Sequence, residues 1–172
     1  MELKYFYIEL HVGMEKVMLN YRKLINLLPW MIVVILMLLI FNLSAQPAPS
    51  SDQLSLGVTA RVLEILKMIS PRTEWNLDIL NHVIRKNAHF FIYLVLSIVV
   101  QIAVRRNKID GLKGILLVLA ICVLYASSDE LHQLFVSGRG AQVKDVFIDS
   151  AGAVLGIVIY GAARRYTSRF QL

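Results

Sequence analysis

Four long apolar stretches, separated by short polar ones, dominate the pattern of this chain. They cover about residues 24–43, 88–104, 112–128 and 146–163. Each is close to the roughly 20 apolar residues that cross a bilayer as a helix, and basic residues stand near most of their ends. The pattern therefore predicts an all-α membrane protein with four transmembrane helices.

The chain between the first two spans is more polar and carries two signals. Residues 44–55 (SAQPAPSSDQLS) are rich in serine and proline, a composition that predicts a loop. From residue 58 to 69 apolar and charged side chains fall on different helix faces, which predicts an amphipathic helix. The apolar positions are Val58, Val62, Ile65, Leu66 and Ile69, and the charged ones are Arg61, Glu64 and Lys67. We expect this helix outside the cytoplasm, either along the membrane interface or packed against the other helices.

A further helix is expected to lead into the second span. Ser70 and Pro71 end the amphipathic helix, and Thr73 is the expected N-cap of the next one. Trp75 fits an interfacial anchor.

The length of 172 residues fits one domain, which we place at residues 22–165. Residues 1–21 are expected to form an N-terminal cytoplasmic extension, and residues 166–172 a cytoplasmic tail. The first apolar stretch could instead be a cleaved signal peptide, because basic residues precede it and Ser44-Ala45-Gln46 follows. Its apolar core is long for a signal peptide and three spans follow, so we expect a retained anchor.

Composition and charge agree with this topology. Hydrophobic residues make up 57% of the chain and charged ones 17%, whereas soluble domains carry about 25% charged residues. The single cysteine, Cys122, excludes an intrachain disulfide. With four spans, both termini lie on the same side of the membrane, and 11 of the 18 lysines and arginines are on that side. The positive-inside rule therefore places both termini in the cytoplasm. The net charge of +6 thus reflects topology, and no nucleic-acid partner is expected.

Polar residues from three spans should meet at the outer boundary of the membrane. The start of the second span, the end of the third and the start of the fourth all lie there, and several of these residues are four positions apart on one helix face. We expect them to form one polar binding pocket. Its candidate residues are Arg85, Lys86, His89, Tyr93, Asp129, Glu130, Gln133, Arg139, Asp145 and Asp149.

Asp149 lies about one turn inside an apolar stretch, where an isolated carboxylate costs about 3 kcal/mol. It should therefore be paired, with Arg139 or His89 as partners, or be neutral. Gly152 and Gly156 follow it as a Gly-xxx-Gly pair, which predicts close helix packing.

Several chemistries could use such a pocket. Carboxylates and histidines could hold a cation, but no fixed-spacing ligand motif is present, so we expect no metal and no cofactor. The basic residues could hold the phosphate or carboxylate of a lipid or peptide head group. Asp129, Glu130 or His89 could supply acid–base catalysis. A purely structural ion-pair network is the remaining alternative.

Three spaced motifs carry a resemblance to a known family. They are RKNAHFFIYLVLS from Arg85, SSDELHQLFVSGR around Asp129, and KDVFIDSAGAVLG from Lys144. Together they resemble the VanZ-like family of bacterial membrane proteins over about residues 22–165. Asp149 departs from the pattern, which usually has an asparagine at this position.

The resemblance implies a role in the bacterial cell envelope. The named member of the family lowers susceptibility to teicoplanin-type glycopeptides, and membership does not establish an enzymatic activity. We therefore expect a protein of the bacterial cytoplasmic membrane that recognises a lipid-linked cell-wall precursor or the glycopeptide itself. The alternative is a membrane-embedded hydrolase or transferase for a lipid-linked phosphate, with Asp129 or Glu130 as base and Arg139 holding the phosphate.

Overall fold

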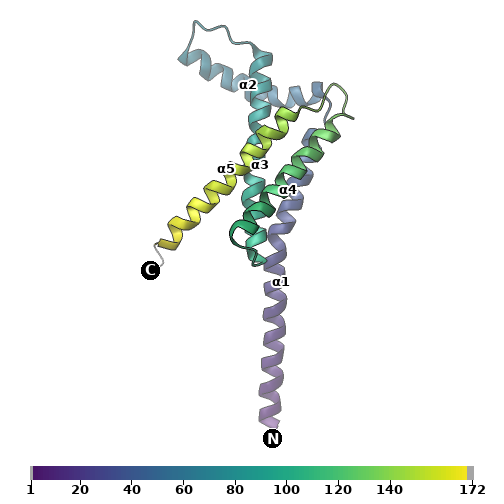
Figure 1. The fold of residues 1–172 in the computed structure, drawn as a ribbon, viewed down its shortest axis with the longest axis vertical. Coiled ribbons are helices and arrows are strands. Elements are labelled where there is room, and N and C mark those ends of the chain that lie inside the picture. Colours follow the sequence, from purple (N-terminus) through teal and green to yellow (C-terminus); the bar gives the residue numbers. More distant parts are fainter. Residues whose placement is uncertain (1, 170–172) are drawn as a thin grey trace.

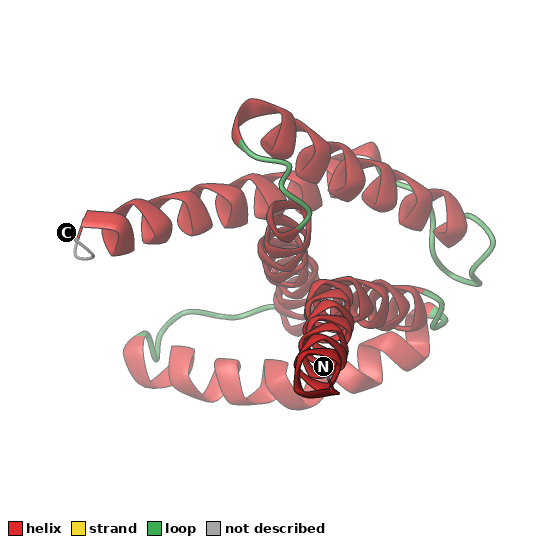
Figure 2. Cartoon of the chain, turned by 90° about the horizontal axis from the view of Figure 1, so that it is seen from below, coloured by secondary structure: helices red, strands yellow, loops and turns green. Residues whose placement is uncertain are grey.

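The computed structural model describes residues 2–169, except the side chains of residues 2–12, 16, 19, 20, 22, 23, 48, 52 and 54. This part of the chain forms helices and loops without a strand, as Figure 2 shows. Its helices are α1 (Glu2–Ser44), α2 (Ala48–Ile69), α3 (Leu77–Arg106), α4 (Gly111–Gln133) and α5 (Val143–Arg169). Residues 24–44 of α1, together with α3, α4 and α5, are long and apolar enough to cross a membrane. The prediction of an all-α membrane protein with four spans is confirmed.

Helix α3 lies at the centre of the molecule, in contact with each of the other helices. Figure 1 shows α5 crossing α3 and then diverging from it toward the C-terminus. Helix α2 lies crosswise at the end of the molecule where α4 also meets α5 (Figures 1 and 2). The hydroxyl of Thr59 donates a hydrogen bond of 2.7 Å to Asn81 Oδ1, which ties α2 to α3.

Two glycines set the close approach of α5 to α3. A Cβ atom on Gly152 would lie 2.2 Å from the carbonyl oxygen of Phe90, and one on Gly156 would lie 2.4 Å from that of Leu94. Only residues without a side chain allow this spacing, as in other small-residue helix contacts. The close packing predicted from the Gly-xxx-Gly pair is confirmed, and it brings Asp149 against α3.

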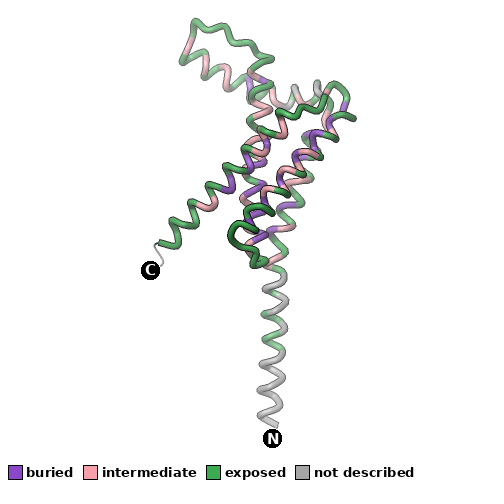
Figure 3. Tube along the Cα trace, viewed as in Figure 1, coloured by how far each residue is buried: buried purple, intermediate pink, exposed green. Residues whose placement is uncertain are grey.

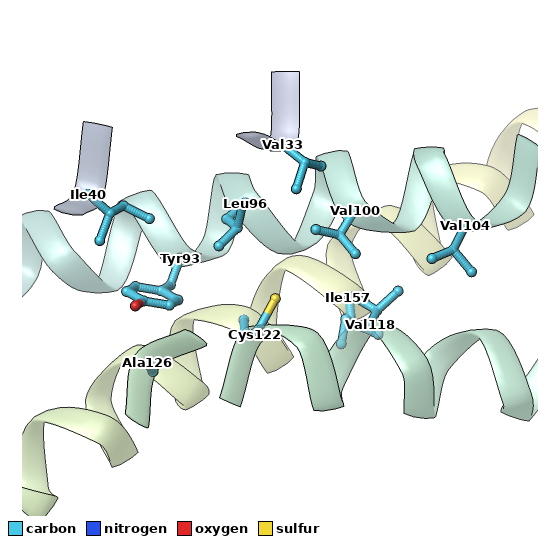
Figure 4. Close-up of a cluster of buried hydrophobic side chains, with 11 residues drawn as sticks. Val33, Ile40, Tyr93, Leu96, Val100, Val104, Val118, Cys122, Ala126 and Ile157 are labelled. Atoms are coloured by element: carbon cyan, nitrogen blue, oxygen red, sulfur yellow. The ribbon is translucent and has the colours of Figure 1, made fainter. Parts of the chain in front are cut away.

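The core lies where the four spans meet, and Figure 3 shows buried residues concentrated there. Each span contributes side chains to it. Figure 4 shows Val33, Ile40, Tyr93, Leu96, Val100, Val104, Val118, Cys122, Ala126 and Ile157 in this cluster. Large apolar side chains such as Leu124 and Phe147 are instead exposed. In a membrane protein such side chains face the lipid tails.

The loop predicted over residues 44–55 is mostly wrong, because α2 already begins at Ala48. Pro47 occupies the N-cap position and Pro49 lies in the first turn. Proline is tolerated there because the first amides of a helix have no intrahelical partner. The serine- and proline-rich composition therefore marks the beginning of a helix.

The N-cap predicted at Thr73 is also wrong. Thr73 lies in a turn, where its hydroxyl is 2.7 Å from that of Ser70. Asn76 is the N-cap, with its side chain accepting hydrogen bonds from the amides of Asp78 and Ile79 at 2.9 and 3.1 Å. Helix α3 consequently begins well before the predicted second span at residue 88.

The predicted domain boundaries do not coincide with helix ends. Helix α1 is continuous across residues 21 and 22, and α5 across residues 165 and 166. Residues 1 and 170–172 lie outside the described part of the chain. The division into extension, domain and tail stays a prediction.

Candidate functional site

A cavity of about 470 Å³ opens at the end of the bundle next to α2, and we call it the α2-end cavity. All five helices and the α4–α5 connection contribute to its wall. Eight of the ten residues selected from the sequence line it. They are Arg85, Lys86, His89, Glu130, Gln133, Arg139, Asp145 and Asp149.

The basic side of the cavity is a stripe along α3. His82, Lys86 and His89 are separated by four and three residues, so they lie on one helix face, and Arg85 is adjacent. The ammonium group of Lys86 lies 2.5 Å from Asp145 Oδ1, and each of these side chains is 24% exposed. This ion pair joins the stripe to the start of α5.

The α4–α5 connection folds over the cavity instead of pointing away from the bundle. Glu130 Oε2 accepts a hydrogen bond of 2.8 Å from the backbone amide of Gln142. Gly138 has a φ of +75°, a left-handed conformation that favours glycine. Arg139 follows it, with Nη2 3.5 Å from the carbonyl oxygen of Leu43 on α1.

Asp149 is 2% exposed and lies on the cavity wall. Within the described residues no hydrogen bond or ion pair reaches its carboxylate, so the pairing predicted with Arg139 or His89 is not observed. Its electrostatic environment includes the carboxylates of Asp129, Glu130 and Asp145, and the ammonium of Lys86. A charge in such a place is costly unless a partner neutralises it. The other alternative predicted from the sequence, a neutral Asp149, stays a prediction.

Tyr93 and Asp129 do not line the cavity, although the sequence placed them with the other eight. Tyr93 is fully buried in the core beside Tyr125. Asp129 lies beneath the cavity, where its Oδ2 accepts hydrogen bonds from Ser44 at 2.7 Å and Gln133 at 3.3 Å. Asp129 thus holds Gln133 and the end of α1 in place rather than facing a ligand.

The structure adds lining residues that the sequence reasoning missed. Those from the start of α2 were hidden by the loop assignment. His82 was signalled by its spacing to Lys86 and His89 but was not selected. The additions with polar side chains are Gln46, Ser51, Ser55, His82 and Gln142. The aliphatic ones are Ile40, Leu43, Val58, Ile84, Ile92 and Ile148.

The cavity therefore joins charged groups to an aliphatic wall. This combination suits an amphiphilic ligand, with a charged head group held next to the first part of an apolar tail. No cluster of three or more histidine, cysteine or acidic residues suited to a metal ion occurs in the described part of the chain. That no metal or cofactor is bound stays a prediction.

Fold and composition define a multi-pass α-helical membrane protein with a polar cavity at one end of its bundle. The VanZ/LLP1 family model matches residues 29–164, and the chain belongs to this family. No curated protein and no solved structure matches the chain.

Proposed function

We propose that this protein resides in the bacterial cytoplasmic membrane with both termini in the cytoplasm. The support is the excess of lysine and arginine on the side of the termini. In this orientation the α2-end cavity opens toward the cell exterior, at the level where lipid head groups lie.

We further propose that the protein acts in the cell envelope and lowers susceptibility to teicoplanin-type glycopeptides. The carrying observation is the amphiphilic lining of the α2-end cavity, where Arg85, Lys86 and Arg139 stand beside aliphatic residues. Guanidinium groups bind phosphate and carboxylate strongly, and the aliphatic wall accommodates an apolar tail. A lipid-linked cell-wall precursor and the acylated tail of the drug both have this chemistry.

The test is expression of the gene in a sensitive Gram-positive host, with inhibitory concentrations of teicoplanin and vancomycin as the readout. Expression should raise the inhibitory concentration of teicoplanin. Arg85→Gln, on the cavity wall, should abolish the rise, whereas Arg61→Gln, with a side chain 83% exposed on α2, should preserve it. No change for either drug on expression of the wild type would contradict the resistance role.

A hydrolase or transferase for a lipid-linked phosphate is the second candidate. It is favoured by Glu130 and His89, because both line the same cavity as Arg139. Glu130 is the better candidate base, since Asp129 lies below the wall with its Oδ2 occupied. In vesicles with a lipid-linked phosphate, Glu130→Gln should abolish turnover without loss of membrane insertion. Full turnover by this variant would exclude Glu130 as the catalytic base.

A further inference from the structure

A second cavity, of about 430 Å³, lies at the other end of α3. It is lined by the end of α3, the beginning of α4 and the C-terminal part of α5, the region where α5 diverges in Figure 1. We call it the α3–α4 turn cavity. Among the described residues, none lines both this cavity and the α2-end cavity.

Its lining is predominantly cationic. Arg105, Arg164 and Arg165 line it together with one carboxylate, that of Asp110, which leaves a formal charge of +2. Asp110 Oδ1 lies 2.9 Å from Arg105 Nε and 3.8 Å from Arg164 Nη1. The carboxylate thus occupies the position that an external anion would take between two guanidinium groups.

The beginning of α4 adds backbone donors to the same cavity. Asp110 is the N-cap of α4, but its side chain makes no capping hydrogen bond because it turns to the arginines. The first amides of a helix have no intrahelical partner and form a natural anion site. A Cβ atom on Gly111 would have no atom within 4 Å, so there is open space beside this helix end.

Gln101 supplies a polar group at the inner end of the cavity. It lies one turn before Arg105 on the same face of α3 and is 5% exposed. Its Oε1 is buried without a hydrogen-bond partner among the described residues. Since this oxygen is itself enclosed, Gln101 marks the depth that the cavity reaches along α3, and the arginines and the beginning of α4 carry the binding argument.

We propose that the α3–α4 turn cavity binds a phosphate ester. The arginines and the first amides of α4 hold the phosphate. Basic cavities between membrane helices bind phospholipid head groups in this way. The phosphate comes either from an anionic phospholipid or from a soluble phosphate. This site is independent of the function proposed for the α2-end cavity.

The experiment measures lipid retention by the full chain, purified in an uncharged detergent, using native mass spectrometry. The probes are dioleoyl phosphatidylglycerol, dioleoyl phosphatidylcholine and inorganic phosphate. Phosphatidylglycerol should be retained in preference to phosphatidylcholine. The double variant Arg164→Gln/Arg165→Gln should weaken this binding about tenfold, since it removes charge-assisted hydrogen bonds to phosphate. The control Arg61→Gln/Lys67→Gln removes the same charge from exposed positions on α2 and should bind like the wild type.

A gain of affinity tests the same site from the opposite direction. Asp110→Asn removes the competing carboxylate and should strengthen phosphatidylglycerol binding, which a merely structural ion pair would not do. Displacement of the lipid by inorganic phosphate would support the phosphate site and identify a soluble source. Equal retention of phosphatidylcholine, an equal loss in the control, or no gain with Asp110→Asn would each overturn the proposal.

Discussion

At the scale of single residues, Asp149 is the acidic residue of the α2-end cavity whose burial is unfavourable. Other charged groups there have partners, such as Lys86 with Asp145 and Glu130 with the amide of Gln142. Asp149 is buried on the same wall and has no such partner within the described residues. A residue that reduces stability in this way is typical of a site whose ligand supplies the missing interaction.

Replacing Asp149 with asparagine should therefore stabilise the protein. The asparagine amide has the same size as the carboxylate and no charge. The free energy of unfolding in detergent should therefore rise by about 1 kcal/mol, and the unfolding temperature should rise with it. The fluorescence of Trp30 and Trp75 provides the measurement. Asp145→Asn is the matched control, because it breaks the ion pair with Lys86 and should lower the unfolding temperature. A loss of stability in Asp149→Asn would show that the carboxylate is satisfied by the protein itself.

At the scale of elements, the contact between α3 and α5 decides where the functional side chains lie. The stripe from His82 to His89 belongs to α3, whereas Asp145 and Asp149 belong to α5. These two groups share one cavity because the glycines at positions 152 and 156 let the helices approach closely. Separation of the helices would move the two charged groups apart.

Gly152→Ala should destabilise the protein by about 2 kcal/mol or more, because its Cβ would lie 2.2 Å from the carbonyl oxygen of Phe90. Gly161→Ala is the control on the same helix, since no atom lies within 4 Å of its Cβ position. That variant should be as stable as the wild type or slightly more so, as expected for alanine in a helix. Equal unfolding temperatures for the two variants would contradict the role of Gly152 in packing.

At the scale of the whole molecule, the two cavities lie at opposite ends of α3 and so near opposite membrane surfaces. Both have charged walls, while the outward faces of the spans carry exposed apolar side chains. This arrangement suits a protein embedded in lipid with aqueous contact at both ends. The proposed orientation assigns the α2-end cavity to the exterior and the α3–α4 turn cavity to the cytoplasm.

Cysteine labelling in intact cells tests this orientation. Cys122 is buried and is replaced by serine to give a background without thiols. A membrane-impermeant maleimide should then label Ser137→Cys, in the exposed α4–α5 connection, but not Lys108→Cys, in the exposed α3–α4 turn. Labelling of position 108 alone would invert the topology and place the α2-end cavity in the cytoplasm.

The number of spans and most of the charged residues of the α2-end cavity could be predicted from the sequence. Apolar stretches of membrane-spanning length locate helices regardless of their partners, because the bilayer alone imposes that length. Topology then brings the helix ends of one side together, and eight selected residues indeed share the α2-end cavity. The failures involved helix beginnings. A segment rich in proline and serine, as near residue 48, occurs both in loops and in the first turn of a helix, so the beginning of α2 and its lining side chains were missed, although the helix over residues 58–69 was predicted.

The sequence by itself determined that this protein is an all-α, four-span membrane protein, because helix length and apolar content are local properties. Only the tertiary structure decided which polar residues face a cavity and which lie beneath it. Asp129 and Glu130 are adjacent in the chain, yet one binds Ser44 within the bundle and the other lines the α2-end cavity. Their difference arises from the rotation of α4 against its neighbours, and packing between helices, not spacing along one helix, sets that rotation.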